Sequence, residues 1–467
     1  MQLPEKFITS LAGIKGFDKE AFEKVHQSQE QTTSIRFNPN KALSIVNGEW
    51  PISPIHHSAF TIAQKVPWST HGYYLSERPS FTFDPLFHAG AYYVQEASSM
   101  FLEEALKQTT DLSKPLRVLD LCAAPGGKST LIQSLISAES LLVSNEVIKT
   151  RVNILTENIT KWGSSNVIVT NNDPKDFERL ENYFDVIVID APCSGSGLFR
   201  REPEAIEEWS EANVALCSQR QQRIISDVWT SLKENGILIY STCSYSKQED
   251  EYILDWIFET LNARSLKLNA NNEWNITETT SDKHGCYGYR FFPDKTKGEG
   301  FFIAAFRKNT GSDFIFPKSK KNVFEKLSRR EETIVKQWLK NESSYILLKK
   351  ENSVYALPVY HANDFHFIHS SLYIKKAGIL IGKLVHDELV PEHELAMSAI
   401  ISKEVQFVDL SEEDAINYLS KEEFNINTAI KSWTLARYNK HNLGWIKVLQ
   451  NRMNNYYPSS WRILKRK

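Results

Sequence analysis

Two of the five cysteines follow apolar segments that are typical of β-strands. The first segment reads "VIVIDAPC" and ends at Cys193, and the second reads "LIYSTC" and ends at Cys243. If the two strands are neighbours in a parallel sheet, they lie about 4.8 Å apart, and their carboxyl ends open on the side where such sheets bind ligands. The pattern therefore predicts two thiols that face one pocket.

Three kinds of chemistry fit two thiols in one pocket. A disulfide is disfavoured because the first residues, "MQLPEKFITS", lack the apolar core of a signal peptide, so we expect the protein in the reducing cytoplasm. A metal site is disfavoured because the sequence has no CxxC pair and no histidines at metal-ligand spacing, and we expect no metal. Covalent catalysis is the third possibility.

Covalent catalysis by a cysteine suits methylation of a cytosine at carbon 5. This carbon is a poor nucleophile until a thiolate adds to carbon 6, and the resulting enamine can then accept a methyl group. The reaction also needs an acid near N3 and a group that assists release of the thiol. Asp190, three residues before Cys193, is the natural acid. Lys128 is one candidate for the group that activates the nucleophilic thiolate.

The segment "VLDLCAAPGGKST" predicts a strand, a glycine-rich turn and the start of a helix. Gly126 and Gly127 let a ligand approach the backbone, and the first N–H groups of the helix are free to bind it. The glycine spacing matches neither a Walker loop nor the dinucleotide motif GxGxxG. Acids follow the first three predicted strands, at Asp120, Glu146 and Asp173. Glu146 could accept hydrogen bonds from a ribose and Asp173 could meet an adenine edge, which indicates an adenosine-bearing ligand such as S-adenosylmethionine.

Strands and helices alternate between residues 116 and 262, which predicts a doubly wound parallel sheet. The expected strands cover residues 116–121, 141–146, 166–170, 185–190 and 237–242. We expect the helix before the fifth strand to run through Leu232 and to end at Gly236. The apolar segment 298–308 predicts an additional antiparallel strand at the end of the sheet.

The size and composition of the chain predict several domains and no membrane span. The chain has 467 residues, 41% of them hydrophobic, and no apolar run approaches the ~20 residues of a spanning helix. The net charge is −2, so any surface for nucleic acid must be a local patch. Beyond the sheet, segment 318–332 starts a charged helix, 344–358 predicts a hairpin with its turn near residue 351, and 373–384 predicts two short strands.

The last 37 residues, 431–467, contain nine lysine or arginine residues and no acidic residue. Aromatic residues are interleaved with these cations: Trp433, Tyr438, Trp445, Tyr456, Tyr457 and Trp461. Cations that bind phosphates, together with rings that stack on bases, would form an RNA-binding surface. A cationic face over aromatic core residues explains the same pattern, so both interpretations stay open.

The remaining cysteines receive no reactive role. Cys217 lies among apolar residues of a predicted helix, which indicates packing, and Cys286 lies in an expected loop. Cys122 is expected to line the glycine-rich turn rather than to react. Residues 200–202, "RRE", follow the Cys193 segment and could contact RNA or form an ion pair within their loop.

Four segments together resemble one enzyme family. "LDLCAAPGGKST", "VIDAPCSGSGLFRREPE", "YSTCSYSKQEDE" and "RFFPDKTKGEGFFIAAF" follow in this order, and they are similar to the signature segments of the Sun-type RNA cytosine-C5 methyltransferases. The resemblance implies that Cys243 is the nucleophile, that Cys193 assists product release, and that Asp190 serves both the base and the cofactor pocket. It also implies an S-adenosylmethionine site made by Cys122, Ala123, Ala124, Pro125, Gly126, Gly127, Lys128, Glu146, Asp173 and Asp190.

The resemblance extends to both flanks of these segments. "VPWSTHGYYL" and "HAGAYYVQEASSM" are similar to the region that leads into the catalytic core of the family. "AGILIGKL" and "GWIKVLQNRMNNYYPSSWRI" resemble the RsmF group of bacterial 16S ribosomal RNA methyltransferases, which carry a PUA-like RNA-binding domain at the carboxyl terminus. The resemblance thus favours RNA binding for the basic tail.

The expected fold is α/β, a Rossmann-like S-adenosylmethionine-dependent methyltransferase with an N-terminal α+β RNA-binding domain and a C-terminal PUA-like, β-rich domain. The expected domains are an RNA-binding domain, a catalytic domain, a linker helix with a small middle domain, and a PUA-like domain, covering residues 1–105, 106–308, 309–385 and 386–467. We expect a monomer that methylates 16S ribosomal RNA, alone or in the small ribosomal subunit, and that uses neither DNA nor membranes as a partner. Two alternatives stay open: the same chemistry on transfer RNA, and a non-catalytic RNA-binding factor in ribosome assembly.

Overall fold

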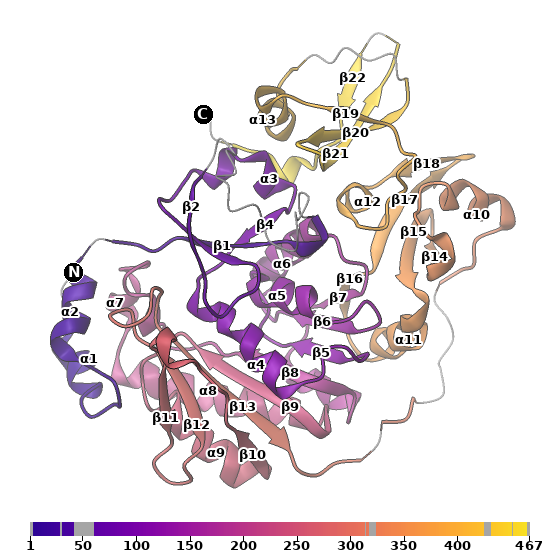
Figure 1. Ribbon diagram of the computed structural model, residues 1–467. Coiled ribbons are helices and arrows are strands. Elements are labelled where there is room, and N and C mark those ends of the chain that lie inside the picture. The colour runs from indigo at the N-terminus through magenta and orange to yellow at the C-terminus, as the bar shows by residue number, and fades with distance from the viewer. Residues whose placement is uncertain are drawn as a thin grey trace.

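The described part of the chain forms four β-sheets with helices packed around them (Figure 1). This computed structural model describes residues 3–28, 30–41, 60–312, 314–316, 324–424, 431–450 and 452–464. The largest sheet has ten strands, and each of the other three has four. No helix in the described ranges is both long and apolar enough to cross a membrane.

The centre of the largest sheet is the predicted doubly wound arrangement. Its parallel strands are β5 (Arg117–Asp120), β6 (Leu141–Asn145), β7 (Val167–Thr170), β8 (Phe184–Asp190) and β9 (Leu232–Thr242). They lie in the order β9-β8-β5-β6-β7, so the strand order reverses between β8 and β5. Open α/β sheets bind ligands at such a reversal, beyond the carboxyl ends of the strands.

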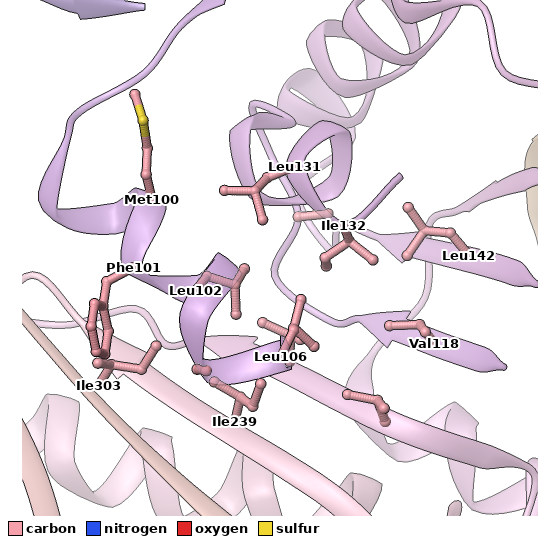
Figure 2. Packing of buried hydrophobic residues seen from close by; sticks show 14 of the residues in the cluster. Met100, Phe101, Leu102, Leu106, Val118, Leu131, Ile132, Leu142, Ile239 and Ile303 are labelled. Carbon is pink, nitrogen blue, oxygen red and sulfur yellow. The ribbon is translucent and has the colours of Figure 1, made fainter. Parts of the chain in front are cut away.

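Both faces of this sheet are buried, which explains the nearly continuous apolar runs in the sequence. Along β8, Val186 and Val188 face one core while Ile187 and Ile189 face the other. One face is covered by α4 (Leu102–Thr109), α5 (Gly127–Leu135) and α6 (Lys149–Trp162), and the other by α8 (Glu211–Trp229), α9 (Glu251–Leu261) and α11 (Ala362–Ser371). Figure 2 shows Leu106 of α4 packed over the sheet.

Antiparallel strands extend the sheet on both sides. The strand predicted at 298–308 is confirmed as β13 (Phe301–Lys308), which pairs antiparallel with β9. It does not end the sheet, because β12 (Tyr287–Phe291) and β11 (Thr277–Thr280) follow it, and β10 (Ala263–Leu266) also pairs with it. On the far side, β16 (Ile374–Ala377) joins β7.

The helix before the fifth strand is shorter than predicted. It ends at Trp229, and Leu232 is already the first residue of β9, where it pairs with Phe184 of β8. Asn235, at φ 59°, adopts the left-handed conformation within this strand. Pairing with the neighbouring strand and complete burial of Leu232 outweigh the helical spacing of the apolar residues.

The N-terminal region consists of a helical pair and a small sheet. The helices α1 (Glu5–Ser10) and α2 (Lys19–Gln27) pack through Phe7 and Phe22 against Tyr245, the second residue after Cys243. The sheet has the order β2-β3-β1-β4. Its strands are β1 (Ser34–Phe37), β2 (Ile62–Lys65), β3 (Gly72–Leu75) and β4 (Tyr92–Val94), with α3 (Pro85–His88) before β4. Buried Arg36 joins this small sheet to the helices that cover the largest sheet, because it donates to the Thr130 hydroxyl of α5 at 2.6 Å.

The third sheet contains the predicted hairpin. It consists of β14 (Tyr345–Lys350), β15 (Ser353–Pro358), β17 (Ile379–Val385) and β18 (Glu388–Pro391), with α10 (Arg329–Lys336) and α12 (His393–Met397) beside it. The predicted charged helix begins only after Ser328, and residues 317–323 lie outside the described residues. The predicted domain limit between residues 385 and 386 falls inside the β17–β18 hairpin.

The fourth sheet shows where the aromatic residues of the tail lie. It consists of β19 (Phe407–Asp409), β20 (Trp433–Tyr438), β21 (His441–Val448) and β22 (Met453–Asn455), with α13 (Glu412–Ser420) against it. Trp433, Trp445 and Tyr457 are buried in hydrophobic cores, whereas Tyr456 is exposed. Most of the large rings therefore stabilise the module, which was the second of the two interpretations of the tail. Residues 465–467, which include three of its cations, lie outside the described residues.

Candidate active site

A cavity of about 650 Å³ lies at the carboxyl edge of the parallel strands. Nine of the predicted site residues line it: Cys122, Ala124, Pro125, Lys128, Glu146, Asp173, Asp190, Cys193 and Cys243. Three others do not. Ala123 is buried in the core, while Gly126, at φ 118°, and Gly127 form the turn into α5. The left-handed conformation of Gly126 explains the glycine at that position.

The two cysteines meet inside the cavity. Their sulfur atoms are 3.1 Å apart, and both thiols are free. Cys243 directly follows the end of β9 at Thr242, and Cys193 lies three residues beyond the end of β8. Because Asp190 pairs in register with Ser241, the two strand ends are level and deliver both thiols to one place.

Backbone contacts hold the two cysteine loops together. The Gly197 N–H donates to the Cys243 carbonyl at 2.7 Å, and the Tyr245 N–H donates to the Ser196 hydroxyl at 3.0 Å. A Cβ atom on Gly197 would lie 2.6 Å from the Gly300 carbonyl and 2.7 Å from the Cys243 carbonyl. Position 197 therefore requires glycine, since any side chain would push the loops apart.

Asp190 is paired with Lys128 beside the thiols. The Lys128 ammonium lies 2.7 Å from Asp190 Oδ2, and the Ser241 hydroxyl donates to Asp190 Oδ1 at 2.8 Å. Burial lowers the pKa of Lys128, but the charge and hydrogen bond of Asp190, together with the charges of Asp120 and Cys243, raise this pKa overall. Lys128 is therefore a cation in the cavity, and it also interacts electrostatically with Cys243.

The thiol of Cys193 is held in its protonated form. Its hydrogen bond with Cys243, its burial and the charge of Glu249 together raise the pKa of Cys193 well above its ordinary value. A protonated Cys193 can donate its hydrogen to the sulfur of Cys243. Such a bond stabilises negative charge on Cys243, which is the charge that a nucleophilic thiolate carries.

The other end of the cavity carries the features of an adenosine site. Glu146 is buried, and its Oε1 accepts the Ile148 N–H at 2.9 Å. The apolar side chains of Val147 and Ile148 line the cavity and are about half exposed. Asp173 caps the helical turn after β7 and keeps its side chain 47% exposed. Apolar walls for a flat ring and carboxylates for hydroxyl and amino groups fit the adenosine part of S-adenosylmethionine.

Asp120 is buried beneath this end of the cavity. Its Oδ2 accepts the Ser129 hydroxyl at 2.6 Å, and its Oδ1 has no hydrogen-bond partner. Burial raises the pKa of Asp120 to about 7. Asp120 does not line the cavity, so it supports the glycine-rich turn through Ser129 rather than contacting a ligand.

Three functional candidates were not predicted from the sequence. Glu249 is completely buried and bonds to both cysteine loops. Glu299 lines the cavity, and burial raises its pKa to about 7. Arg220, on α8, also lines the cavity. The segments "KQEDE" and "KGEG" contain two of these residues, but acids near strand ends are too common to indicate a role.

Arg200 and the two cysteines outside the cavity have structural roles. Arg200 is buried, lies 3.5 Å from Glu299 and donates to the Gly298 carbonyl, so it forms an ion pair, but with a segment outside its own loop. Cys217 is buried in α8, as predicted. Cys286 is also buried and directly precedes β12. Within the described ranges, no group of three or more histidine, cysteine or acidic residues could hold a metal ion.

Three family models match the chain in sequence order. Residues 3–97 match the N-terminal domain of 16S rRNA methyltransferase RsmF, residues 108–307 match 16S rRNA methyltransferase RsmB/F, and residues 405–463 match the methyltransferase RsmF PUA domain. The chain belongs to the RsmB/F methyltransferase family. The resemblance of the four signature segments is thereby confirmed.

Individual relatives agree with this assignment. Ribosomal RNA small subunit methyltransferase F of Shewanella piezotolerans is 29% identical over 404 residues, which cover 84% of each chain. The protein of the same name from Pectobacterium atrosepticum is 34% identical over 254 residues, which cover 53% of this chain and 51% of that one.

Solved structures show the same fold. A methyltransferase homologue from Pyrococcus horikoshii is 26% identical, with a TM-score of 0.52, over 66% of this chain and all of that one. NSun6 from Pyrococcus horikoshii with SFG is 18% identical, with a TM-score of 0.54, over 66% of this chain and 98% of that one. The fold is that of the S-adenosylmethionine-dependent methyltransferases, and the predicted Rossmann-like and PUA-like parts are confirmed.

Proposed function

We propose that this protein methylates carbon 5 of a cytosine in 16S ribosomal RNA through a covalent bond between Cys243 and the base. The observation that carries this proposal is the 3.1 Å separation of the Cys193 and Cys243 sulfur atoms in a cavity that also contains Lys128 and Asp190. Methyl transfer alone needs no thiol. A pair of thiols beside a carboxylate is what addition to a pyrimidine and its reversal require.

The first step is addition of the Cys243 sulfur to carbon 6 of the base. The Lys128 cation and the protonated Cys193 thiol both stabilise the thiolate of Cys243 before attack. The base must leave its stack to reach the thiol, because the sulfur lies inside the cavity. As the bond forms, negative charge develops at N3.

Asp190 is the group that delivers a proton to N3. The Asp190 carboxylate takes the proton of the Cys243 thiol before attack and passes it to N3 as the new bond forms, and the Lys128 ammonium, 2.7 Å away, stabilises the carboxylate that remains. Ser241 fixes the direction of the carboxyl through its hydrogen bond to Oδ1. S-adenosylmethionine, when bound at the Glu146 end of the cavity, supplies the electrophilic methyl group.

The last step releases the product. Carbon 5 gives its proton to solvent that enters the cavity, the bond to carbon 6 breaks with its electron pair, and Cys243 departs as a thiolate. N3 then returns its proton to the Asp190 carboxylate. Cys193 lies beside the departing sulfur and can donate its S–H to it as negative charge returns. In the proposed reaction, Cys243 is therefore the nucleophile, and Cys193 assists release of the product.

The choice of 16S ribosomal RNA rests on the matched family and its relatives. All three matched models belong to RsmF or RsmB/F, and they include N-terminal and PUA domains outside the catalytic region. Transfer RNA is the alternative substrate, because a cavity for one base and the cofactor would accept a cytosine from either RNA. A non-catalytic assembly factor is disfavoured, because it would have no need for adjacent thiols beside a carboxylate–ammonium pair.

Bisulfite sequencing tests the reaction and its substrate together. Purified protein and S-adenosylmethionine are incubated separately with unmodified 16S ribosomal RNA and with transfer RNA. A single cytosine of the 16S RNA that resists deamination supports the proposal. Protection in transfer RNA alone would replace the substrate, and protection in neither RNA, despite methyl transfer to another position, would overturn the chemistry.

A further inference from the structure

One buried carboxylate connects the two cysteine loops. Glu249 lies just before α9 and is completely buried. It accepts the Ser194 N–H at 2.8 Å and the Ser244 hydroxyl at 2.7 Å, and the Ser194 hydroxyl also donates to it. Ser194 directly follows Cys193, and Ser244 directly follows Cys243. A single side chain therefore bonds to the neighbours of both thiols.

The surroundings of Glu249 hold this carboxylate in place. Gln221 of α8 donates to Oε1 at 3.1 Å, and the Tyr240 hydroxyl donates to the Glu249 carbonyl at 2.6 Å. All of these donors are neutral. The carboxylate therefore keeps a negative charge close to Cys193 and bonds to α8 and to both loops, while Tyr240 of β9 holds the backbone of Glu249.

We propose that Glu249 is a positioning residue, which sets the spacing of the Cys193 and Cys243 sulfur atoms so that both can act on one pyrimidine. This inference rests on the proposed function for its purpose, but the spacing itself is a property of the protein alone. Without the carboxylate, Ser194 and Ser244 lose their shared acceptor. The loops keep their contacts at Gly197 and Tyr245, but they lose the link that lies directly beside the two cysteines. The negative charge of Glu249 also adds to the raised pKa of Cys193, after the hydrogen bond with Cys243 and burial.

A disulfide-forming reagent measures the spacing without RNA or cofactor. Diamide accepts two electrons and two protons from two thiols, and joins them as a disulfide only if their sulfur atoms can meet. Mass spectrometry of peptides gives the rate at which Cys193 and Cys243 become linked in the full chain. We expect Glu249→Ala to lower this rate at least tenfold relative to the unmodified protein.

Two further variants separate positioning from general stability. Asp255→Asn is the matched control, since Asp255 is a buried carboxylate of α9 that accepts the Lys283 and His284 N–H groups, away from the cysteines. It should leave the disulfide rate unchanged. Glu249→Gln keeps one acceptor oxygen for the serines and should restore part of the rate, and it replaces Glu249→Ala if that variant does not fold.

The two proposals fail in different ways. Methyl transfer by Glu249→Ala should fall at least a hundredfold in kcat with a smaller change in KM, since the substrate still binds. A disulfide rate and a kcat equal to those of the unmodified protein would overturn the positioning role. A disulfide rate that depends on Glu249 in a protein that methylates no cytosine would uphold the positioning role and reject the proposed function.

Discussion

The two cysteine loops contain the same reactive group at the same edge of the sheet, yet their surroundings carry opposite charges. The hydrogen bond with Cys243 and burial raise the pKa of Cys193, and the nearby negative charge of Glu249 acts in the same direction. Cys243 interacts with the positive charge of Lys128. The sulfur atoms are only 3.1 Å apart, so charge rather than place distinguishes the two thiols.

This difference shows how two identical side chains in one site can have different chemical roles, because their charged neighbours differ. A thiol with a raised pKa remains a donor, and a thiol beside a cation can carry the charge of a nucleophile. The surroundings thus agree with the assignment of attack to Cys243 and of release to Cys193. Each prediction below either alters a group of the molecule that the proposed reaction uses or measures its reactivity.

The largest effect is expected from Cys243→Ala. Without this sulfur no bond to carbon 6 can form, so transfer of labelled methyl groups from S-adenosylmethionine to 16S RNA should fall to background. Cys217→Ala is the matched control, because Cys217 is buried in α8 and does not line the cavity. Substantial methyl transfer by Cys243→Ala would contradict the assignment of the nucleophile.

Asp190→Asn should have the next largest effect. The amide can keep the Ser241 hydrogen bond but cannot carry a proton to N3, so kcat should fall by about 10²–10³, a typical loss for an acid–base group. Asp185→Asn, at the opposite end of the same strand, where the carboxylate pairs with Lys233 at 2.7 Å, should retain kcat. Equal losses in both variants would mean that Asp190 only supports the strand.

The reactivity of Cys193 tests the charge difference directly. Because its pKa is raised, little of it is thiolate at pH 8, and its alkylation by iodoacetamide should be slower than that of an exposed cysteine and should accelerate only at higher pH. Cys243→Ala removes the first cause of the shift, so the pKa falls and alkylation of Cys193 at pH 8 should become about fivefold faster. An unchanged rate in that variant would show that Cys243 does not control Cys193.

The smallest effect is expected in the C-terminal module. Deleting the tail is uninformative because Trp445 belongs to the core, so charge reversal is the better test. Lys440 and Arg462 are exposed, and their joint replacement by glutamate should weaken RNA binding by roughly tenfold at physiological salt and reduce its salt dependence. Arg437→Gln is the control, since Arg437 pairs with Asp409 at 3.1 Å. Unchanged RNA binding after charge reversal would place the RNA elsewhere.

The sequence was most informative where the topology of the sheet determines the position of a residue. Parallel strands bring their carboxyl ends to one edge, so Cys193, Asp190 and Cys243 could be placed together from strand ends alone. The acids at Glu146 and Asp173 follow the same rule, and both line the cavity. Periodicity and strand ends were sufficient for these residues.

The sequence was least informative where contacts between distant segments determine the position of a residue. Glu249 reaches the cysteine loops only because α9 folds back against β9, and β16 joins the central sheet from a segment 204 residues after β7. The rings of the tail could not be assigned, because Trp433 and Trp445 are buried by packing in one core with residues of β15, β17 and α12. No local pattern specifies such contacts.

The most direct test of the central claim is to trap the covalent bond. Cys193→Ala, incubated with 16S RNA and S-adenosylmethionine and resolved on a denaturing gel, should accumulate protein linked to RNA, because release is slowed while attack continues. Digestion and mass spectrometry should then find the nucleotide on Cys243. Absence of the linked species while methyl transfer continues, or linkage to a residue other than Cys243, would contradict the division of roles between the two thiols.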